Sequence, residues 1–141
     1  IVHSRVARSN IYLLSKFGVD LVLCGPAPLV PASLAKIAPG VTIEYDIVKA
    51  IEGADVIMML RVQLERQHEP PMPAGEYFRF YGLQLEHLEH ARHNAIVMHP
   101  GPINRGREIS SEVADSQSSV ILNQVENGVA VRMAVLERIL A

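Results

Sequence analysis

The chain has 141 residues, enough for one domain with a substantial core, and its 49% hydrophobic and 20% charged residues are typical of a globular protein. A formal net charge of −2 gives no support for binding to nucleic acid or to an anionic membrane surface. No apolar run is long enough to span a membrane, so we expect a cytoplasmic protein, and because the sequence begins without methionine we expect a piece of a longer one.

A helical pattern and then a strand pattern open the sequence. Residues 5–18 predict a helix that ends at Gly18, a natural C-terminal cap. One face of this helix consists of Val6, Asn10, Leu13 or Leu14, and Phe17. The apolar run Asp20–Gly25 predicts a buried parallel strand. Its Cys24 is the single cysteine, so no internal disulfide forms, and we expect a buried, unreactive thiol.

The same alternation continues over the next segments. Pro31–Gly40 predicts a helix that begins and ends at prolines, and Val41–Tyr45 predicts an edge strand because its apolar residues alternate. Asp46–Ala54 predicts a helix capped by its aspartate, and Asp55–Leu60 predicts a second buried strand.

The second half contains a long irregular segment, a strand and a final helix. Arg61–Gly82 is rich in charge and proline, and a loop of this length in a compact domain is usually functional or mobile. Ala95–Pro100 predicts a third buried strand, and Ser118–Ala141 predicts a helix despite its central Asn127-Gly128. The alternation predicts a three-layer, doubly wound α/β domain whose central parallel sheet is flanked by helices.

Ligands of open α/β sheets bind beyond the carboxyl ends of the strands. Residues 61–63 and residues 100–106 follow two of the predicted strands. Residues 3–10 lie at the same edge if a further strand ends near the start of the chain. We therefore expect three loops to converge on one rim of the sheet.

Two arginines are the best candidates for anion binding at this rim. The guanidinium groups of Arg5 and Arg61 can each bind a carboxylate through two hydrogen bonds, so together they can hold a dicarboxylate. Gln63 adds an uncharged donor and acceptor beside Arg61. The alternative is that the arginines form surface ion pairs with nearby glutamates, namely Glu65, Glu69 or Glu86.

The loop after the third strand offers acceptors. Pro102 prevents the chain from coiling, so the carbonyl groups of Pro100 and Gly101 remain available to accept hydrogen bonds from an NH2 group. The alternative is a plain strand-to-helix turn. Further along, Asn104, Arg105 and Arg107 either reach an anion or face water.

Other chemistries find little support in the sequence. There is no glycine-rich dinucleotide loop, no phosphate-binding P-loop and no serine in a nucleophile elbow. His87, His90 and His93 share helical spacing, but their charged surroundings favour a solvated face over a metal site. We therefore expect a site that binds and orients its ligands without a nucleophile of its own.

Four stretches carry a resemblance to a known family. "HSRVARSN", "MLRVQLER", "MHPGPINRG" and "NQVENGVAVRMAVL" occur in this order, and together they resemble the aspartate-binding half of aspartate carbamoyltransferases. The resemblance covers essentially the whole chain, residues 1–141, as a single domain. Ornithine carbamoyltransferases usually show His-Cys-Leu-Pro where this sequence has His-Pro-Gly-Pro.

The resemblance implies an activity and assigns roles to residues. It implies transfer of the carbamoyl group of carbamoyl phosphate to the amine of L-aspartate, an early step of pyrimidine biosynthesis that needs no cofactor and no metal. Arg5 and Arg61 would bind the aspartate carboxylates with Gln63 beside them. The Pro100 and Gly101 carbonyls would hold the carbamoyl NH2, and Pro102 would fix the turn through a cis peptide bond.

The same resemblance implies a missing partner. The family's phosphate-binding Ser-Thr-Arg-Thr motif and its catalytic histidine belong to a preceding carbamoyl-phosphate domain, and neither is in this chain. We assign no catalytic residue to this half and expect it to be inactive alone, monomeric or weakly associated, although the full-length enzyme would be a homotrimer. Two alternatives remain: another acceptor such as ornithine, or a catalytically silent domain that serves only in assembly.

Overall fold

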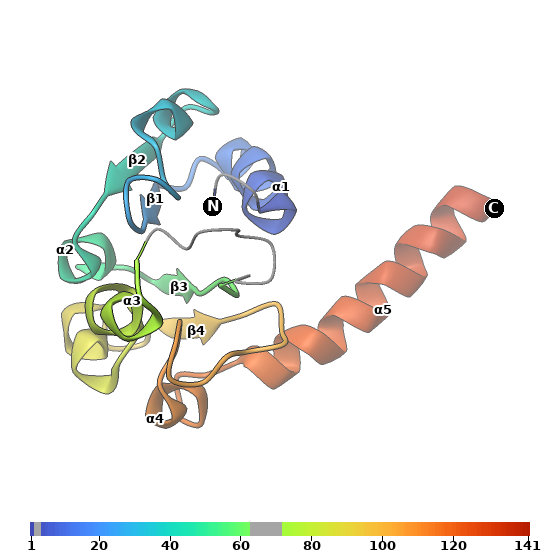
Figure 1. Cartoon of the computed structure of the whole chain (residues 1–141). Coiled ribbons are helices and arrows are strands. Elements are labelled where there is room, and N and C mark those ends of the chain that lie inside the picture. Colours follow the sequence, from blue (N-terminus) through green and yellow to red (C-terminus); the bar gives the residue numbers. More distant parts are fainter. Residues whose placement is uncertain (2–3, 63–71) are drawn as a thin grey trace.

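The computed structural model describes residues 1, 4–62 and 72–141, in which helices alternate with short parallel strands (Figure 1). The strands are β1 (Leu21–Cys24), β2 (Val41–Glu44), β3 (Val56–Met58) and β4 (Ile96–Met98). The α-helices are α1 (Arg5–Leu14), α2 (Ile47–Ile51), α3 (Ala74–Tyr81), α4 (Ser111–Ala114) and α5 (Ile121–Leu140). The described residues also form the short 3-10 helices η1 (Ser15–Phe17), η2 (Ala32–Lys36) and η4 (Leu85–His90).

The first predicted helix is confirmed, but its buried face is different from the expected one. The Ser4 hydroxyl caps α1 by accepting the Ala7 N–H at 3.2 Å, and the helical segment stops at Gly18, whose φ is 66°. The buried side chains are Ala7 and Ile11, whereas Phe17 is 71% exposed. Both faces of this helix carry apolar residues, so periodicity alone could not identify the buried one.

The strands pair in two separate parallel ladders. Leu21 of β1 lies opposite Val41 of β2, and Val56 of β3 lies opposite Ile96 of β4. The α/β class with parallel strands flanked by helices is therefore confirmed. Within the described residues, however, there are two two-stranded sheets in place of one continuous central sheet. An apolar run predicts a strand but does not identify the strand with which it pairs.

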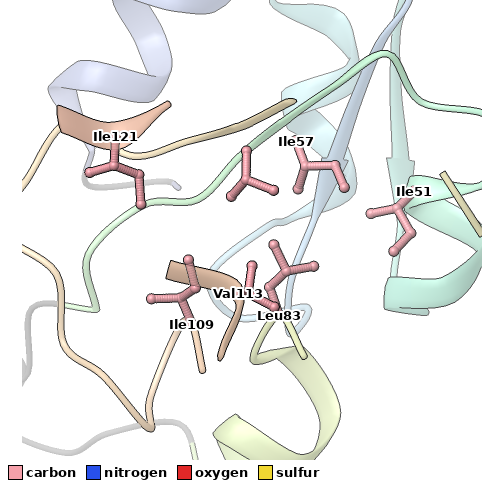
Figure 2. Close-up of a cluster of buried hydrophobic side chains, with 7 residues drawn as sticks. Ile51, Ile57, Leu83, Ile109, Val113 and Ile121 are labelled. Atoms are coloured by element: carbon pink, nitrogen blue, oxygen red, sulfur yellow. The ribbon is translucent and has the colours of Figure 1, made fainter. Parts of the chain in front are cut away.

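Each ladder has its own hydrophobic core. Around β1 and β2 the buried residues are Ile11, Leu23, Val30, Leu34 and Val41. Around β3 and β4 they are Ile51, Ile57, Leu83, Val97, Ile109, Val113 and Ile121 (Figure 2). The second core joins β4 to the residues before α4 and to the first turn of α5. It thereby fixes both ends of the loop that follows β4.

Three of the remaining predicted segments differ in detail. The helix expected over Asp46–Ala54 is α2, and its Asp46 carboxylate accepts the Val48 N–H at 2.9 Å. Pro31–Gly40 contains only the 3-10 helix η2, which begins directly after Pro31 and ends before Pro39. The expectation that Arg61–Gly82 is irregular is wrong for its second part, where α3 begins directly after Pro73. Residues 63–71 of this segment lie outside the described residues.

The C-terminal helix α5 is confirmed and runs unbroken through Asn127-Gly128. In Figure 1 it extends away from the rest of the chain. Ile121 is its one buried residue, and its large exposed apolar side chains are Leu122, Val125, Val129, Val131, Met133, Val135, Leu136, Ile139 and Leu140. No helix in the described ranges is long and apolar enough to cross a membrane.

Candidate functional site

The carboxyl ends of β3 and β4 meet at one edge of the second sheet. The Met59 N–H donates to the Met98 carbonyl at 2.9 Å, one residue beyond the last paired residues of the ladder. Arg61 follows β3 and Pro100 follows β4 within two or three residues of these strand ends. The parallel ladder therefore brings two of the three predicted loops to the same rim.

Asn104 joins these two loops directly. Its side-chain Nδ2 donates to the Val62 carbonyl at 3.4 Å, although the two residues are far apart in sequence. Arg61, the residue before Val62, is half-buried beside this contact. Gln63, which the sequence places in the same site, lies outside the described residues.

The proline loop extends over residues 99–110, between the end of β4 and the start of α4, and is far longer than a direct strand-to-helix turn. Gly101 has φ 66°, a backbone conformation that favours glycine, and the Gly101–Pro102 peptide bond is cis, as expected. No N–H group of the described residues donates to the Pro100 or Gly101 carbonyl. The predicted role of these two oxygens as acceptors for a ligand requires them to be free of such bonds.

Arg5 lies at the first position of α1, and its side chain is exposed. Helix α1 is connected to β3 by the Asn10 side chain, whose Nδ2 donates to Sδ of Met58 at 3.0 Å. None of the hydrogen bonds or ion pairs of the described residues joins Arg5 to Arg61 or to the proline loop. The structure thus brings Arg61 and the proline loop together and places Arg5 on a neighbouring element.

Two other charged candidates have structural partners. Arg105 forms a two-pronged ion pair with Asp115, with both N–O distances 2.7 Å, so its guanidinium is engaged on the surface. The carboxylate of Glu86 lies 3.9 Å from the His87 ring. Glu65 and Glu69, the other suggested partners for the two site arginines, lie outside the described residues.

The expectation of a solvated histidine face is wrong for His87. This residue is buried in η4, and its Nδ1 accepts the Gln84 N–H at 3.2 Å, which closes the first turn. Its burial lowers the pKa of the imidazole, and the nearby Glu86 opposes this shift. In the part of the chain that the structure describes, no three His, Cys, Asp or Glu side chains are grouped closely enough to hold a metal ion.

Sequence reasoning missed Glu108, which is fully buried at the end of the proline loop. Burial alone would raise the pKa of its carboxyl, but the neighbouring His99 ring and hydrogen bonds from Asn104 and Val62 outweigh burial and hold the pKa below its ordinary value. Tyr77 on α3 lies near this negative charge, and burial together with Glu108 raises its pKa to about 12. A single acidic residue in an irregular loop gives no periodic signal from which its burial could be predicted.

Comparison with known proteins agrees with the resemblance in the sequence. Residues 2–139 match the family model described as "Aspartate/ornithine carbamoyltransferase, Asp/Orn binding domain". The aspartate carbamoyltransferase catalytic subunit of Solibacter usitatus is 74% identical over 140 residues, which are 99% of this chain and 46% of that protein. The corresponding subunit of Koribacter versatilis is 51% identical over 141 residues, which are 100% of this chain and 46% of that protein.

Solved structures of ornithine carbamoyltransferases share the fold. The enzyme from Burkholderia thailandensis has a TM-score of 0.76 at 26% identity, and the match covers 92% of this chain and 42% of that one. The enzyme from Pyrococcus furiosus has a TM-score of 0.74 at 27% identity, with 92% and 44% covered. The chain thus spans somewhat less than half the length of its relatives. It belongs to the aspartate/ornithine carbamoyltransferase family, in which it corresponds to the Asp/Orn-binding domain.

Proposed function

We propose that this chain is the aspartate-binding domain of an aspartate carbamoyltransferase. In the proposed reaction the amine of L-aspartate attacks the carbonyl carbon of carbamoyl phosphate. The C–O bond to phosphate then breaks, and the amine loses a proton, which gives N-carbamoyl-L-aspartate and phosphate. The observation that carries the proposal is the contact between the Arg61–Val62 segment and the proline loop through Asn104. It supports a site in which Arg61 binds a carboxylate and the carbonyls of Pro100 and Gly101 accept from the second substrate.

Aspartate would be held by its two carboxylates. The Arg61 guanidinium would bind one carboxylate, since Val62, the next residue, contacts the proline loop. Arg5 on α1 would bind the second carboxylate, with Gln63 beside Arg61. A planar guanidinium matches a carboxylate with two parallel hydrogen bonds, which gives orientation as well as affinity. Oriented in this way, the substrate amine is the only nucleophile that the reaction needs.

Carbamoyl phosphate would be oriented by the proline loop. Its NH2 group would donate to the carbonyl oxygens of Pro100 and Gly101, and Pro102 would keep the loop rigid. Holding the NH2 fixes the direction in which the carbonyl carbon faces the incoming amine. This arrangement accelerates the reaction by orientation and charge stabilisation, with no covalent intermediate on the protein.

Aspartate is a better-supported acceptor than ornithine. The relatives that are 51% and 74% identical to this chain over the aligned residues are named aspartate carbamoyltransferase catalytic subunits. The solved ornithine enzymes are only 26% and 27% identical. The arginine after β3 also suits a second carboxylate, because a cationic side chain would be repelled there.

The rest of the full-length protein would complete the site. Its carbamoyl-phosphate domain would bind the phosphate group, and subunits would assemble as a homotrimer in the cytoplasm to support pyrimidine biosynthesis. The exposed apolar side chains of α5 support the proposal that another part of the full-length protein packs against this chain. So many exposed apolar side chains on one helix are rarely left in contact with water. We therefore expect α5 to pack against the part of the protein outside this chain.

The proposal is tested with the full-length protein, carbamoyl phosphate, and either L-aspartate or L-ornithine. We expect N-carbamoyl-L-aspartate to form, as identified by mass spectrometry, and ornithine to be used at least about a hundredfold less efficiently. Citrulline as the main product would establish the ornithine reading. No product from either acceptor, in a protein that is folded and trimeric, would favour the silent assembly domain.

A further inference from the structure

The proline loop contains two ionisable side chains that are completely buried. His99 at its start and Glu108 at its end both have 0% of their surface exposed. A buried carboxylate is costly unless donors surround it, so a chain that keeps one there has to supply these donors. Neither residue belongs to the substrate-binding groups described above. Glu108 also contacts the other loop of the site at Val62, which suggests a role of another kind.

The Glu108 carboxylate is surrounded by donors from both loops. Its Oε1 accepts the backbone N–H of Asn104, and its Oε2 accepts the Asn104 side-chain Nδ2 at 3.3 Å. The same Oε2 accepts the backbone N–H of Val62 at 3.4 Å. One carboxylate therefore holds the middle of the proline loop and the residue that directly follows Arg61.

His99 extends this arrangement to the residue whose carbonyl faces the proposed ligand. Its Nδ1 accepts the Gly101 N–H at 2.9 Å, so in the neutral ring the proton is on Nε2. Nε2 lies 3.4 Å from Oε1 of Glu108. Gly101, His99 and Glu108 thus form a continuous series of polar contacts, and Asn104 and Val62 join it at the carboxylate.

We propose that Glu108 is a positioning residue, which holds the Arg61–Val62 segment and the proline loop in the relative placement that the proposed reaction requires. It acts through the Val62 N–H on one side and through Asn104 and His99 on the other. This inference rests on the proposed function, because it explains how the aspartate-binding group and the carbamoyl-binding carbonyls are kept together. A displacement of about 1 Å at such a site lowers the rate by about a hundredfold.

The test is Glu108→Gln in the full-length protein. The glutamine side chain has nearly the same shape but only one acceptor oxygen, so its NH2 must face either the Asn104 N–H or the Val62 N–H. We expect the amide hydrogens of Val62 and Asn104 to exchange at least about tenfold faster in the substrate-free variant. We also expect kcat/KM for aspartate to fall by about tenfold to a hundredfold, with a raised KM.

A double-mutant cycle separates positioning from general destabilisation. If Glu108 acts through Arg61, Glu108→Gln loses most of its effect on kcat/KM in an Arg61→Ala background. Additive losses, or unchanged exchange at Val62, would overturn the proposal. The matched control is Glu112→Gln on α4, because Glu112 is exposed and should leave exchange and kinetics unchanged.

The proposal can still be tested if Glu108→Gln does not fold or if the protein lacks the proposed activity. If Glu108→Gln does not fold, Asn104→Ala removes the side-chain bonds to Glu108 and Val62 from a less buried position. This variant must then show faster Val62 exchange and the same non-additivity, or the proposal is wrong. If the wild-type protein carbamoylates no aspartate, the proposed function fails, and the amide exchange alone decides whether Glu108 holds the two loops together.

Discussion

The Gln124 side chain on α5 accepts the backbone N–H of His99 at 2.9 Å, so the last helix is bonded to the residue at which the proline loop begins. His99 is fully buried, and its N–H has no access to water. Gln124 is in the first part of α5, the part that contacts β4. The helix that extends away from the domain is therefore fixed at the edge of the candidate site.

Removing this acceptor should destabilise the domain. Gln124→Met keeps the length and helix propensity of the side chain but leaves the His99 N–H unsatisfied, which costs about 1–3 kcal/mol. Urea unfolding monitored by circular dichroism measures the change in the free energy of unfolding. The same substitution at the exposed Gln117 is the control and should have almost no effect. Equal effects at both positions would show that the Gln124–His99 bond contributes little.

The distal part of α5 should contribute little to the stability of the domain by itself. All side chains from Val125 to Ala141 are exposed, so deletion of residues 127–141 should change the free energy of unfolding of this chain by about 0.5 kcal/mol or less. The same deletion in the full-length protein should be clearly destabilising, because there we expect the apolar face to be covered. Equal, small effects in both proteins would contradict the proposed role of α5.

The sequence predicted the order of elements well and their partners less well. The ranges expected for β1, β3, β4 and α5 each contain the observed element, because periodicity and capping residues are local signals. The division of strands into two sheets and the burial of Ile11 in place of Phe17 depend on contacts between distant segments. Such contacts leave no periodic pattern in a single sequence.

In the candidate site, too, local sequence signals predicted some residues and missed those that depend on distant contacts. Arg61 and the proline loop were found because each follows a predicted strand, and the parallel pairing of β3 and β4 brings them together. Glu108 could not be found in this way, because it binds Val62 across a long separation in sequence. Arg105 was a candidate for anion binding because of its charge, but its guanidinium forms an ion pair with Asp115.

Cys24 should react slowly with thiol reagents. Burial raises the pKa of its thiol to about 11, and the negative charges of Glu44 and Asp46 act in the same direction. Since only the thiolate reacts, a pKa about 2 units above the ordinary value leaves about a hundredfold less thiolate at pH 8. We therefore expect modification by a chromogenic disulfide reagent to be about a hundredfold slower in the folded chain than in urea. Similar rates in both conditions would show that the pKa of the thiol is not raised in the folded chain.

The charge of Glu108 should make stability depend on pH in acid. Its pKa is lower in the folded protein than in the unfolded chain, so its contribution is fully present above the ordinary glutamate pKa of about 4.3. This contribution is lost as the pH falls through the lowered folded value. The difference in unfolding free energy between wild type and Glu108→Gln should therefore shrink below about pH 4. A difference that stays constant over this pH range would contradict the lowered pKa of Glu108.

Arg61 should determine the use of aspartate in the full-length protein. Arg61→Ala removes the proposed two-pronged contact with a substrate carboxylate, so kcat/KM for aspartate should fall by about a hundredfold or more at saturating carbamoyl phosphate. Carbamoyl phosphate binding, measured by calorimetry, should change far less. Arg61→Lys should recover only part of the loss, because an ammonium group cannot reproduce the planar fork.

Arg105→Ala is the matched control for this prediction. Arg105 lies on the proline loop but is engaged with Asp115 on the surface, so its loss should leave aspartate kinetics nearly unchanged. A melting curve for each variant shows whether the protein remains folded. Near-normal aspartate kinetics in Arg61→Ala would mean that Arg61 is an ordinary surface arginine, and failure through unfolding alone would mean that its role is structural. A selective loss of aspartate use, with the fold and carbamoyl phosphate binding intact, is the outcome that a dicarboxylate site at this rim requires.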